Sequence, residues 1–135
     1  MRCALALLLF AVGCLSSFCG PAQKSKSNLH EAVMMFNEGV RWGRLQEVIP
    51  RIHPDSVDHF LEMHREFGED IKVSDYEILN ANHDDKNKKA DVSVRITWYR
   101  ESEMVVKKTM LVQHWEEHGQ DWILIAEEYV SGDEF

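Results

Sequence analysis

The spacing of apolar positions along the chain changes once, near Gly68. Before this point apolar side chains recur every three or four residues, which is typical of one face of an amphipathic helix. The first such stripe contains Leu29, Ala32, Val33, Phe36 and Val40. Asn28 precedes it in the N-cap position and Glu31 follows three residues later, in a near capping-box arrangement. The sequence therefore predicts a helix that starts at Asn28.

Two further helices are expected before Gly68. Gly39 and Gly43 weaken the first helix, and the helical rhythm then continues with a shifted phase. We therefore expect a bend near residues 41–44 and a second, short helix that ends before Pro50. Asp55 is the expected N-cap of a third helix, which Gly68 terminates. The inward stripe of this third helix is Val57, Phe60, Leu61, His64 and Phe67.

After Gly68 the apolar residues alternate with polar ones, as in a half-buried β-strand. The clearest example is Val92, Val94, Ile96 and Trp98. Neighbouring strands are expected over residues 71–81, 104–116 and 122–130, with polar turns between them. Strands joined by such short turns form an antiparallel meander of four strands. Helices followed by strands predict an α+β fold with the helices gathered on one face of the sheet.

The first residues of the chain have the pattern of an export signal. Arg2 precedes an apolar run from Ala4 to Val12, and small residues follow. A basic start, an apolar core and a small-residue cleavage site define a secretory signal peptide. The Val-Gly-Cys sequence ending at Cys14 resembles the lipobox of bacterial lipoproteins. That resemblance implies a signal peptide over residues 1–13, cleavage before Cys14, and a lipid on its thiol that tethers the protein to a membrane.

Two other interpretations of this segment stay open. One is an ordinary signal peptide cut between Cys19 and Ala22, which predicts a secreted protein. The other is an uncleaved anchor, although the apolar run is shorter than the ~20 residues that span a bilayer. Leu15 stands where the acidic inner-membrane retention signal of lipoproteins would be, so the resemblance favours the periplasmic side of the outer membrane. Residues 14–27 then form a flexible, lipidated tether.

The cysteine positions bear on disulfide bonding, and the net charge bears on which partners the protein can bind. All three cysteines lie within the first nineteen residues, so residues 28–135 contain no disulfide and form one domain by length. The net charge is −8, and removing residues 1–13 with Arg2 leaves 14 basic against 23 acidic residues, or −9. This acidity argues against nucleic acid as a partner. It also means that the lipid, and not a basic surface, holds the protein on anionic head groups.

The order of elements and three tryptophan motifs carry a family resemblance. Trp42-Gly43, Gln113-x-Trp115 and Gly119-x-x-Trp122 accompany the helices and the four long strands. Together they resemble the NTF2-like (cystatin-like) α+β cone, in particular small lipoproteins of unknown function that carry this domain, over residues 28 to about 130. In that family a curved sheet wraps around the helices and often leaves a pocket for catalysis, ligand binding or dimer contacts. The fold alone does not choose among these.

The candidate pocket-lining residues are His64, Trp98 and His114. His64 lies on the apolar stripe of the third helix, where its side chain is directed toward the sheet and is suited to proton transfer. Its alternative role is that of a core residue with one hydrogen-bond partner. Trp98, with the tryptophans at 115 and 122, either lines an apolar pocket or pairs across strands to stabilise the sheet.

No catalytic residue, metal or cofactor is assigned. Isomerases and dehydratases of the resembled fold use an Asp or His base with Tyr or Asp donors opposite, but the predicted helices contain no Tyr. His53, His59 and His64 are six and five residues apart, which does not place them on one helical face as an i, i+4 zinc pair would be. The seven histidines therefore predict no metal site.

The sequence favours a non-enzymatic lipoprotein of the cell envelope whose domain binds a small apolar ligand or another envelope protein. One alternative is an isomerase or dehydratase that uses a pocket histidine. Another is a structural module that forms a homodimer through the outer face of the sheet. A deep cavity that exposes His64 beside a second polar group would favour the enzyme, whereas a filled core would argue against it.

Overall fold

The computed structural model describes residues 28–135, and this range is an α+β fold. The helical elements come first: α1 (Leu29–Arg41), α2 (Leu45–Val48), the 3-10 turns η1 (Ile49–Arg51) and η2 (Pro54–Ser56), and α3 (Val57–Met63). The strands follow: β1 (Ile71–Asp84), β2 (Lys89–Arg100), β3 (Val106–His118) and β4 (Asp121–Gly132). The predicted signal peptide, tether and Cys14 lie outside the described residues.

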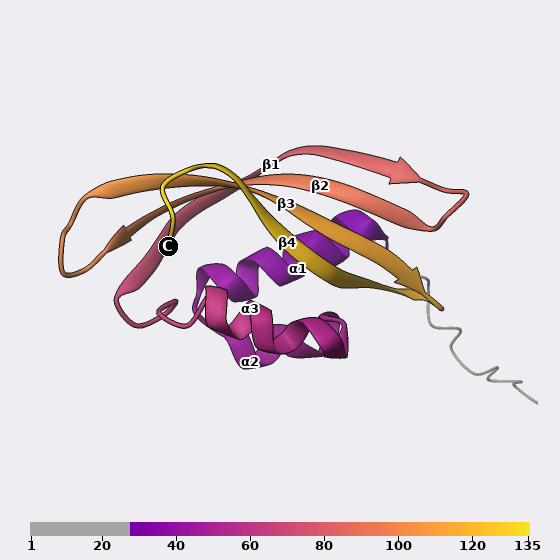
Figure 1. The fold of residues 1–135 in the computed structure, drawn as a ribbon, viewed down its shortest axis with the longest axis horizontal. Helices are drawn as coiled ribbons and strands as arrows, with labels where there is room; N and C mark the ends of the chain where they lie inside the picture. Colours follow the sequence, from indigo (N-terminus) through magenta and orange to yellow (C-terminus); the bar gives the residue numbers. More distant parts are fainter. Residues whose placement is uncertain (1–27) are drawn as a thin grey trace, which may run out of the picture.

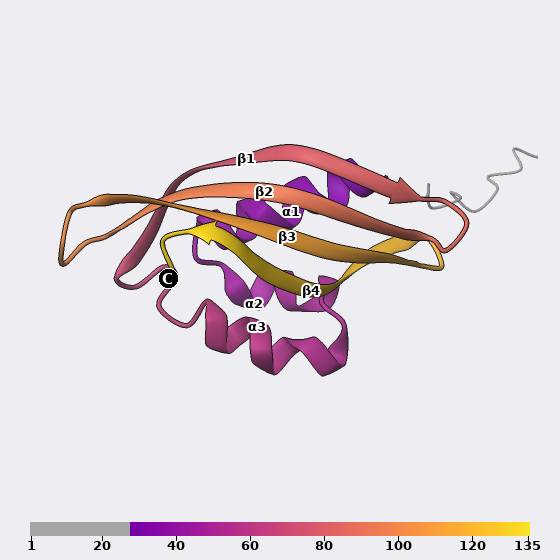
Figure 2. The ribbon, with the colours of Figure 1, turned by 45° about the horizontal axis from the view of Figure 1, so that its top comes forward.

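The four strands form one open antiparallel sheet in the order β1-β2-β3-β4, which confirms the predicted meander. All helices lie on one face of this sheet, and the hairpins extend beyond them at both ends (Figures 1 and 2). The register shifts within the β1–β2 and β3–β4 pairs. Such bulges bend and twist a strand, so they account for a sheet that curves over the helices.

Helix α1 begins as predicted. The Asn28 side chain accepts a hydrogen bond from the backbone N–H of Glu31 at 2.7 Å, which caps the first turn. The predicted apolar stripe from Leu29 to Val40 is buried against the sheet. Phe36 is fully buried and contacts the Trp115 ring edge-on, with 5.5 Å between ring centroids. Helix α1 and the middle strands therefore form the apolar centre of the domain.

The bend after α1 is also confirmed, and its sharpness depends on two glycines. Gly43 has a φ of +65°, and a Cβ on it would lie 2.4 Å from the Cα of Gly68. The α1–α2 corner therefore packs backbone to backbone against the loop that leads into β1. Helix α2 ends at Val48, before Pro50 as expected, and the chain continues directly into the η1 turn.

The prediction for the third helix was wrong at both ends. Asp55 is not its N-cap: the chain enters through η2, where His53 Nδ1 accepts from the Asp55 N–H at 3.3 Å. Helix α3 ends at Met63 because the following backbone bends toward β1, with Ile71 N–H donating to Glu66 O at 3.0 Å. The inward stripe nevertheless holds, since Phe60, His64 and Phe67 are all buried.

The strands are confirmed with shifted ends. β1 extends three residues further than expected, to Asp84, and β3 starts at Val106 because Met104 adopts a φ of +56° in the preceding turn.

The expected pairing of tryptophans across strands was wrong. Trp98 lies opposite Lys107, and Trp115 lies opposite Ala90. Their rings contact phenylalanines from outside the sheet ladder instead.

Candidate functional site

The space between α3 and the sheet contains two pockets, which we call the outer and the inner pocket. The outer pocket has a volume of about 360 Å³ and is lined by Glu62, Met63, Arg65, Glu66, Ile71, Arg100, Leu111, Tyr129, Glu134 and Phe135. The inner pocket has a volume of about 150 Å³ and is lined by Ile52, Asp55, Ser56, His59, Phe60, Met63, Leu124, Ile125, Ala126 and Glu127. Because Met63 lines both, the two pockets adjoin at the end of α3.

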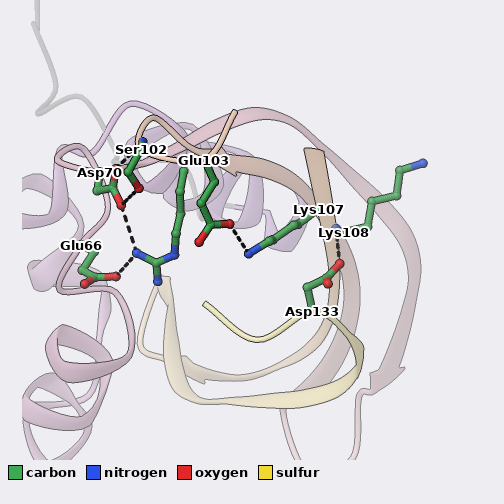
Figure 3. A network of polar contacts seen from close by, with 8 residues as sticks. Glu66, Asp70, Ser102, Glu103, Lys107, Lys108 and Asp133 are labelled. Carbon is green, nitrogen blue, oxygen red and sulfur yellow. Dashed lines mark hydrogen bonds and ion pairs between the residues drawn. The ribbon is translucent and has the colours of Figure 1, made fainter. Parts of the chain in front are cut away.

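The arginines at the outer pocket are already paired with carboxylates. Arg100 Nη1 lies 2.5 Å from Glu66 Oε2 and 3.3 Å from Asp70 Oδ2 (Figure 3). The Glu66 hydrogen bond raises the pKa of Arg100. The backbone N–H and hydroxyl of Ser102 donate to Asp70 at 3.0 and 2.9 Å and lower the pKa of that carboxyl. The Arg100 guanidinium is therefore held by two carboxylates, those of Glu66 and Asp70.

The segment after β4 turns back between the sheet and α3. Gly132 has a φ of +97°, and the Asp133 N–H then donates to Lys108 O at 2.8 Å. The Asp133 carboxylate accepts from the Lys108 N–H at 3.1 Å, which fixes the turn (Figure 3). This places the Phe135 ring 4.7 Å from the Phe67 ring and 5.4 Å from the Trp98 ring, between centroids. Phe135 thus forms one wall of the outer pocket.

A chain of buried polar side chains crosses the core behind the inner pocket. Asn37 on α1 and Gln113 on β3 exchange amide hydrogen bonds of 3.2 and 3.0 Å. Gln113 Nε2 also donates to Glu127 Oε1 on β4 at 2.8 Å. Asn37 Nδ2 reaches Val33 O at 2.8 Å as well. This network links α1, β3 and β4, and buried polar groups that are satisfied in this way specify one packing arrangement.

The network ends at His64, which the structure encloses completely. Its ring stacks on Phe60 with 4.3 Å between centroids and lies 5.8 Å from the Phe135 ring. His64 Nδ1 is 3.0 Å from Phe60 O. His64 Nε2 lies 3.2 Å from Glu127 Oε2, close enough for an ion pair, but the two atoms are not aligned for a hydrogen bond. Both atoms are buried without a hydrogen-bond partner.

The structure separates the three candidate lining residues. His64 is directed toward the sheet, as expected, and Trp98 is also fully buried, with Nε1 donating to Thr109 Oγ1 at 2.8 Å. His114 lies on the opposite face of β3, with its Nδ1 2.7 Å from Asp91 Oδ1. None of the three belongs to the lining of the outer or inner pocket. His64 and Trp98 instead meet at the Phe135 ring, behind the pocket wall.

Sequence reasoning missed Asn37, Gln113 and Glu127. Gln113 shares the inward alternation of Leu111 and Trp115, so the β3 pattern contained a signal for it. Asn37 lies one turn after Val33 in α1, beside the apolar stripe. Glu127 had no such signal, because a bulge in β4 sets its orientation.

Within residues 28–135 no three His, Cys, Asp or Glu side chains are grouped so that they could hold a metal ion. None of the helices formed by these residues has both the length and the apolar character needed to cross a membrane.

Comparison with known proteins finds similarity in fold and none in sequence family. No family model matches the chain, and no curated protein matches it. Among solved structures, the chain is similar to a SEC-C motif containing protein from Rhodopseudomonas palustris, with a TM-score of 0.65 and 11% sequence identity. The match covers 80% of this chain and 83% of that one. At this identity the similarity concerns the arrangement of helices and strands.

Proposed function

We propose that this protein is a lipoprotein of the bacterial cell envelope whose domain binds a small, largely apolar ligand without catalysing a reaction. The observation that carries the proposal is the outer pocket. Its volume of about 360 Å³ falls within the range of roughly 300 to 1,000 Å³ that is usual for small-molecule sites. Ile71, Leu111 and Phe135 contribute apolar surface, while the arginines at its rim are already paired.

The domain is proposed to be an NTF2-like cone. Three helical segments followed by a bent four-stranded meander support this assignment, and so does the position of the pocket between helices and sheet. The likeness to the SEC-C motif protein supports the α+β arrangement alone. The lipid anchor is proposed from the lipobox-like sequence before Cys14, with the periplasmic side of the outer membrane as its location.

Binding is favoured over a pocket-histidine isomerase or dehydratase by the state of His64. A general base has to come within hydrogen-bonding distance of the proton that it removes. His64 has no exposed surface, and Phe60, Phe67 and Phe135 surround its ring. A substrate in the outer pocket is therefore separated from this imidazole by the Phe135 side chain.

The anchor is tested by replacing Cys14 with Ser in the full-length protein. We expect wild-type protein in the detergent-extracted membrane fraction and C14S in the soluble fraction, because the thiol that carries the lipid is gone. The control is Cys19→Ser, which leaves Cys14 in place and should remain with the membrane. If C14S stays with the membrane to the same extent, the lipoprotein assignment is wrong.

Ligand binding is tested with N-phenyl-1-naphthylamine, a neutral apolar fluorescent probe, on the purified full-length protein. Wild-type protein should give a saturable rise in fluorescence. Met63→Trp fills the junction of the two pockets and should weaken binding by roughly tenfold or more. Met104→Trp adds the same ring on an exposed turn and should bind like wild type. Equal binding by both variants would overturn the pocket assignment.

Native mass spectrometry of the same protein supplies a second test. A co-purifying small molecule supports the ligand-binding proposal and identifies the ligand by mass. A homodimer without a bound molecule would favour the structural-module alternative.

A further inference from the structure

The turn between β2 and β3 exposes three consecutive apolar side chains. Met104 is 73% exposed, Val105 54% and Val106 65%. They lie at the end of a hairpin that extends beyond the helices (Figures 1 and 2). Within the described sheet the turns at 85–88 and 119–120 are polar. Single exposed apolar residues are ordinary on a protein surface, whereas a run of three indicates a surface that contacts a partner.

The backbone of this turn is held by the rest of the domain. Met104 has a φ of +56°, which is uncommon for a residue other than glycine, and its N–H donates to Arg100 O at 2.8 Å. The Asp70 carboxylate accepts from the N–H and the hydroxyl of Ser102 at 3.0 and 2.9 Å (Figure 3). The Glu101 N–H donates to Asp70 O at 2.8 Å. These contacts fix the turn to the loop before β1, so its apolar side chains are presented at one position.

The charges next to the turn leave one cation available. Glu103 Oε2 lies 2.9 Å from Lys107 Nζ, and Glu101 Oε2 lies 4.0 Å from Lys72 Nζ, so both carboxylates of the turn face a cation. The Lys108 side chain extends away from Lys107 (Figure 3), and its ammonium forms no ion pair within residues 28–135. Apolar side chains followed by a free ammonium complement the interface of a bilayer, where acyl chains lie beneath anionic phosphates.

The charge of the domain as a whole selects this end of the molecule for such a contact. Residues 28–135 carry 12 basic and 23 acidic side chains, because Arg2, Lys24 and Lys26 precede them. Anionic head groups attract basic segments and repel acidic surface. The β2–β3 turn, with its paired carboxylates and its apolar side chains, can approach a bilayer at lower cost than the acidic remainder.

The chain before the described residues is long enough to bring the turn to a bilayer. Helix α1 starts at the opposite end of the sheet, where Leu29 lines a small pocket with Ala81 and His83. Strand β2 has 12 residues, a length of about 40 Å. Residues 15–27 follow the proposed lipid site at Cys14 and span up to roughly 45 Å when extended. A domain anchored at Cys14 can therefore place the far turn on the same bilayer.

A second copy of the chain fits this turn less well than a bilayer. A standard protein interface involves about 20 to 30 residues on each partner, whereas the turn offers three apolar side chains with charged neighbours. A few apolar side chains are enough for a bilayer contact if a lipid anchor already supplies the attachment.

We propose that Met104, Val105 and Val106 insert into the interface of the bilayer to which the protein is anchored, with the Lys108 ammonium facing lipid phosphates. The inference rests on the lipid anchor of the proposed function and adds a second membrane contact that orients the domain. Arg100, from the same hairpin, lines the outer pocket. The contact therefore places that pocket close to the bilayer, from which an apolar ligand can enter it.

The test uses the full-length protein, processed and lipidated, in vesicles of phosphatidylethanolamine and phosphatidylglycerol. Met104→Cys in a Cys19→Ser background has one reactive thiol, since Cys3 leaves with the signal peptide and Cys14 carries the lipid. With the fluorophore NBD on this thiol, we expect the emission to shift to shorter wavelengths and iodide quenching to be lost when vesicles are present. The same label on Lys86→Cys, in the polar β1–β2 turn, should remain quenched.

Two variants of the protein labelled at position 104 separate the turn from the anchor. Val105→Asp combined with Val106→Asp should abolish the shift, because carboxylates do not enter the bilayer interior, while the protein still floats with the vesicles through its lipid. Leu79→Asp is the matched control. It makes the same kind of change at another exposed apolar position, on β1, and should keep the shift.

Each contrary outcome has a different meaning. If the label at position 104 stays quenched while the protein floats with the vesicles, the turn does not contact the bilayer and the anchor stands. A shift that appears without vesicles as the protein concentration rises would assign the turn to a second copy and overturn the inference. If the protein does not float and its mass shows no lipid, the proposed anchor fails and the inference fails with it.

Discussion

The contact between α1 and the sheet differs in character from the contact between α3 and the sheet. On the α1 side, apolar residues such as Val33 and Phe36 pack against Trp115 and the middle strands, with nearly all of their surface buried. On the α3 side, two pockets remain and the buried residues include His64, Gln113 and Glu127. The α1 side is packed almost entirely with apolar side chains, with Asn37 as its buried polar exception, whereas the α3 side combines two pockets with a buried ion pair between His64 and Glu127.

This difference separates stability from binding. A fully buried large apolar side chain contributes about 1.5–3 kcal/mol, whereas an unpaired buried polar atom costs about 1–3 kcal/mol. The α1 side therefore contributes most of the stability, and the α3 side gives up part of it by leaving two pockets unfilled. The comparison predicts that equal truncations on the two sides have unequal effects.

The largest expected effect is that of Phe36→Ala. Phe36 is fully buried between Phe60 and Trp115, so its loss leaves a closed cavity and should lower the free energy of unfolding by about 3–5 kcal/mol. Phe135→Ala removes the same ring from the pocket wall and should cost less than about 2 kcal/mol. Urea unfolding followed by tryptophan fluorescence measures both. Equal losses would contradict the division into a stabilising side and a binding side.

The next effect concerns the glycine contact that joins the two sides. Gly43→Ala combines a left-handed backbone with a Cβ that would lie 2.4 Å from Gly68 Cα. Gly119→Ala has the same backbone strain, with φ at +66°, but its Cβ meets nothing within 4 Å. The Gly119 variant should lose about 1–2 kcal/mol, and the Gly43 variant about 1–3 kcal/mol more. Similar losses of stability for the Gly43 and Gly119 variants in thermal or urea unfolding would show that the backbone at Gly68 shifts to accommodate the added Cβ at little cost.

The α1 side could be predicted from sequence because its signals are local. The N-cap at Asn28, the stripe to Val40 and the alternation from Val92 to Trp98 each involve residues within one element. Periodicity also placed His64 toward the sheet correctly. The end of α3 was missed because the turn into β1 depends on contacts of Glu66 and Gly68 with Ile71, which periodicity does not encode.

Glu127 shows why the site itself could not be predicted. The alternation of Trp122 and Leu124 makes Ala126 the next inward residue and turns Glu127 outward. In the structure a bulge shifts the register, so that Ala126 lies opposite the outward-facing His114 and Glu127 lies opposite the inward-facing Gln113. A one-residue shift exchanges the two faces of a strand. The pairing of β4 with β3 therefore creates the polar site, and the β4 sequence alone does not reveal it.

The third prediction tests the buried polar network of Asn37, Gln113 and Glu127, which runs from the α1 side of the core to the α3 side. Gln113→Leu leaves Glu127 Oε1 and Asn37 without their partner and should cost about 2 kcal/mol in urea unfolding. Adding Glu127→Leu removes the stranded Oε1 but also takes the ion-pair partner of His64 Nε2, 3.2 Å away, so the double variant should lose a further ~1–3 kcal/mol. A double variant that is more stable than Gln113→Leu would mean that the pair with His64 does not stabilise the fold and that Glu127 is held at a cost.

The smallest expected effect lies beside the outer pocket, where Asp70 accepts hydrogen bonds from Ser102 and pairs with Arg100. These contacts lower the pKa of Asp70 below its ordinary 3.8. A carboxyl whose folded pKa is lowered adds stability above its unfolded pKa and loses it as the pH falls through the folded value.

Wild-type protein should therefore melt slightly above Asp70→Asn at neutral pH, and the gap in Tm should close as the pH falls from about 5 to about 3. Ser102→Ala keeps the backbone donor and removes the hydroxyl, so its pH profile should lie between the two. Because exposed ion pairs contribute little, the gap should stay well below the effect of Gln113→Leu. A gap that persists unchanged into acid would mean that Asp70 acts through the shape of the turn and not through its charge.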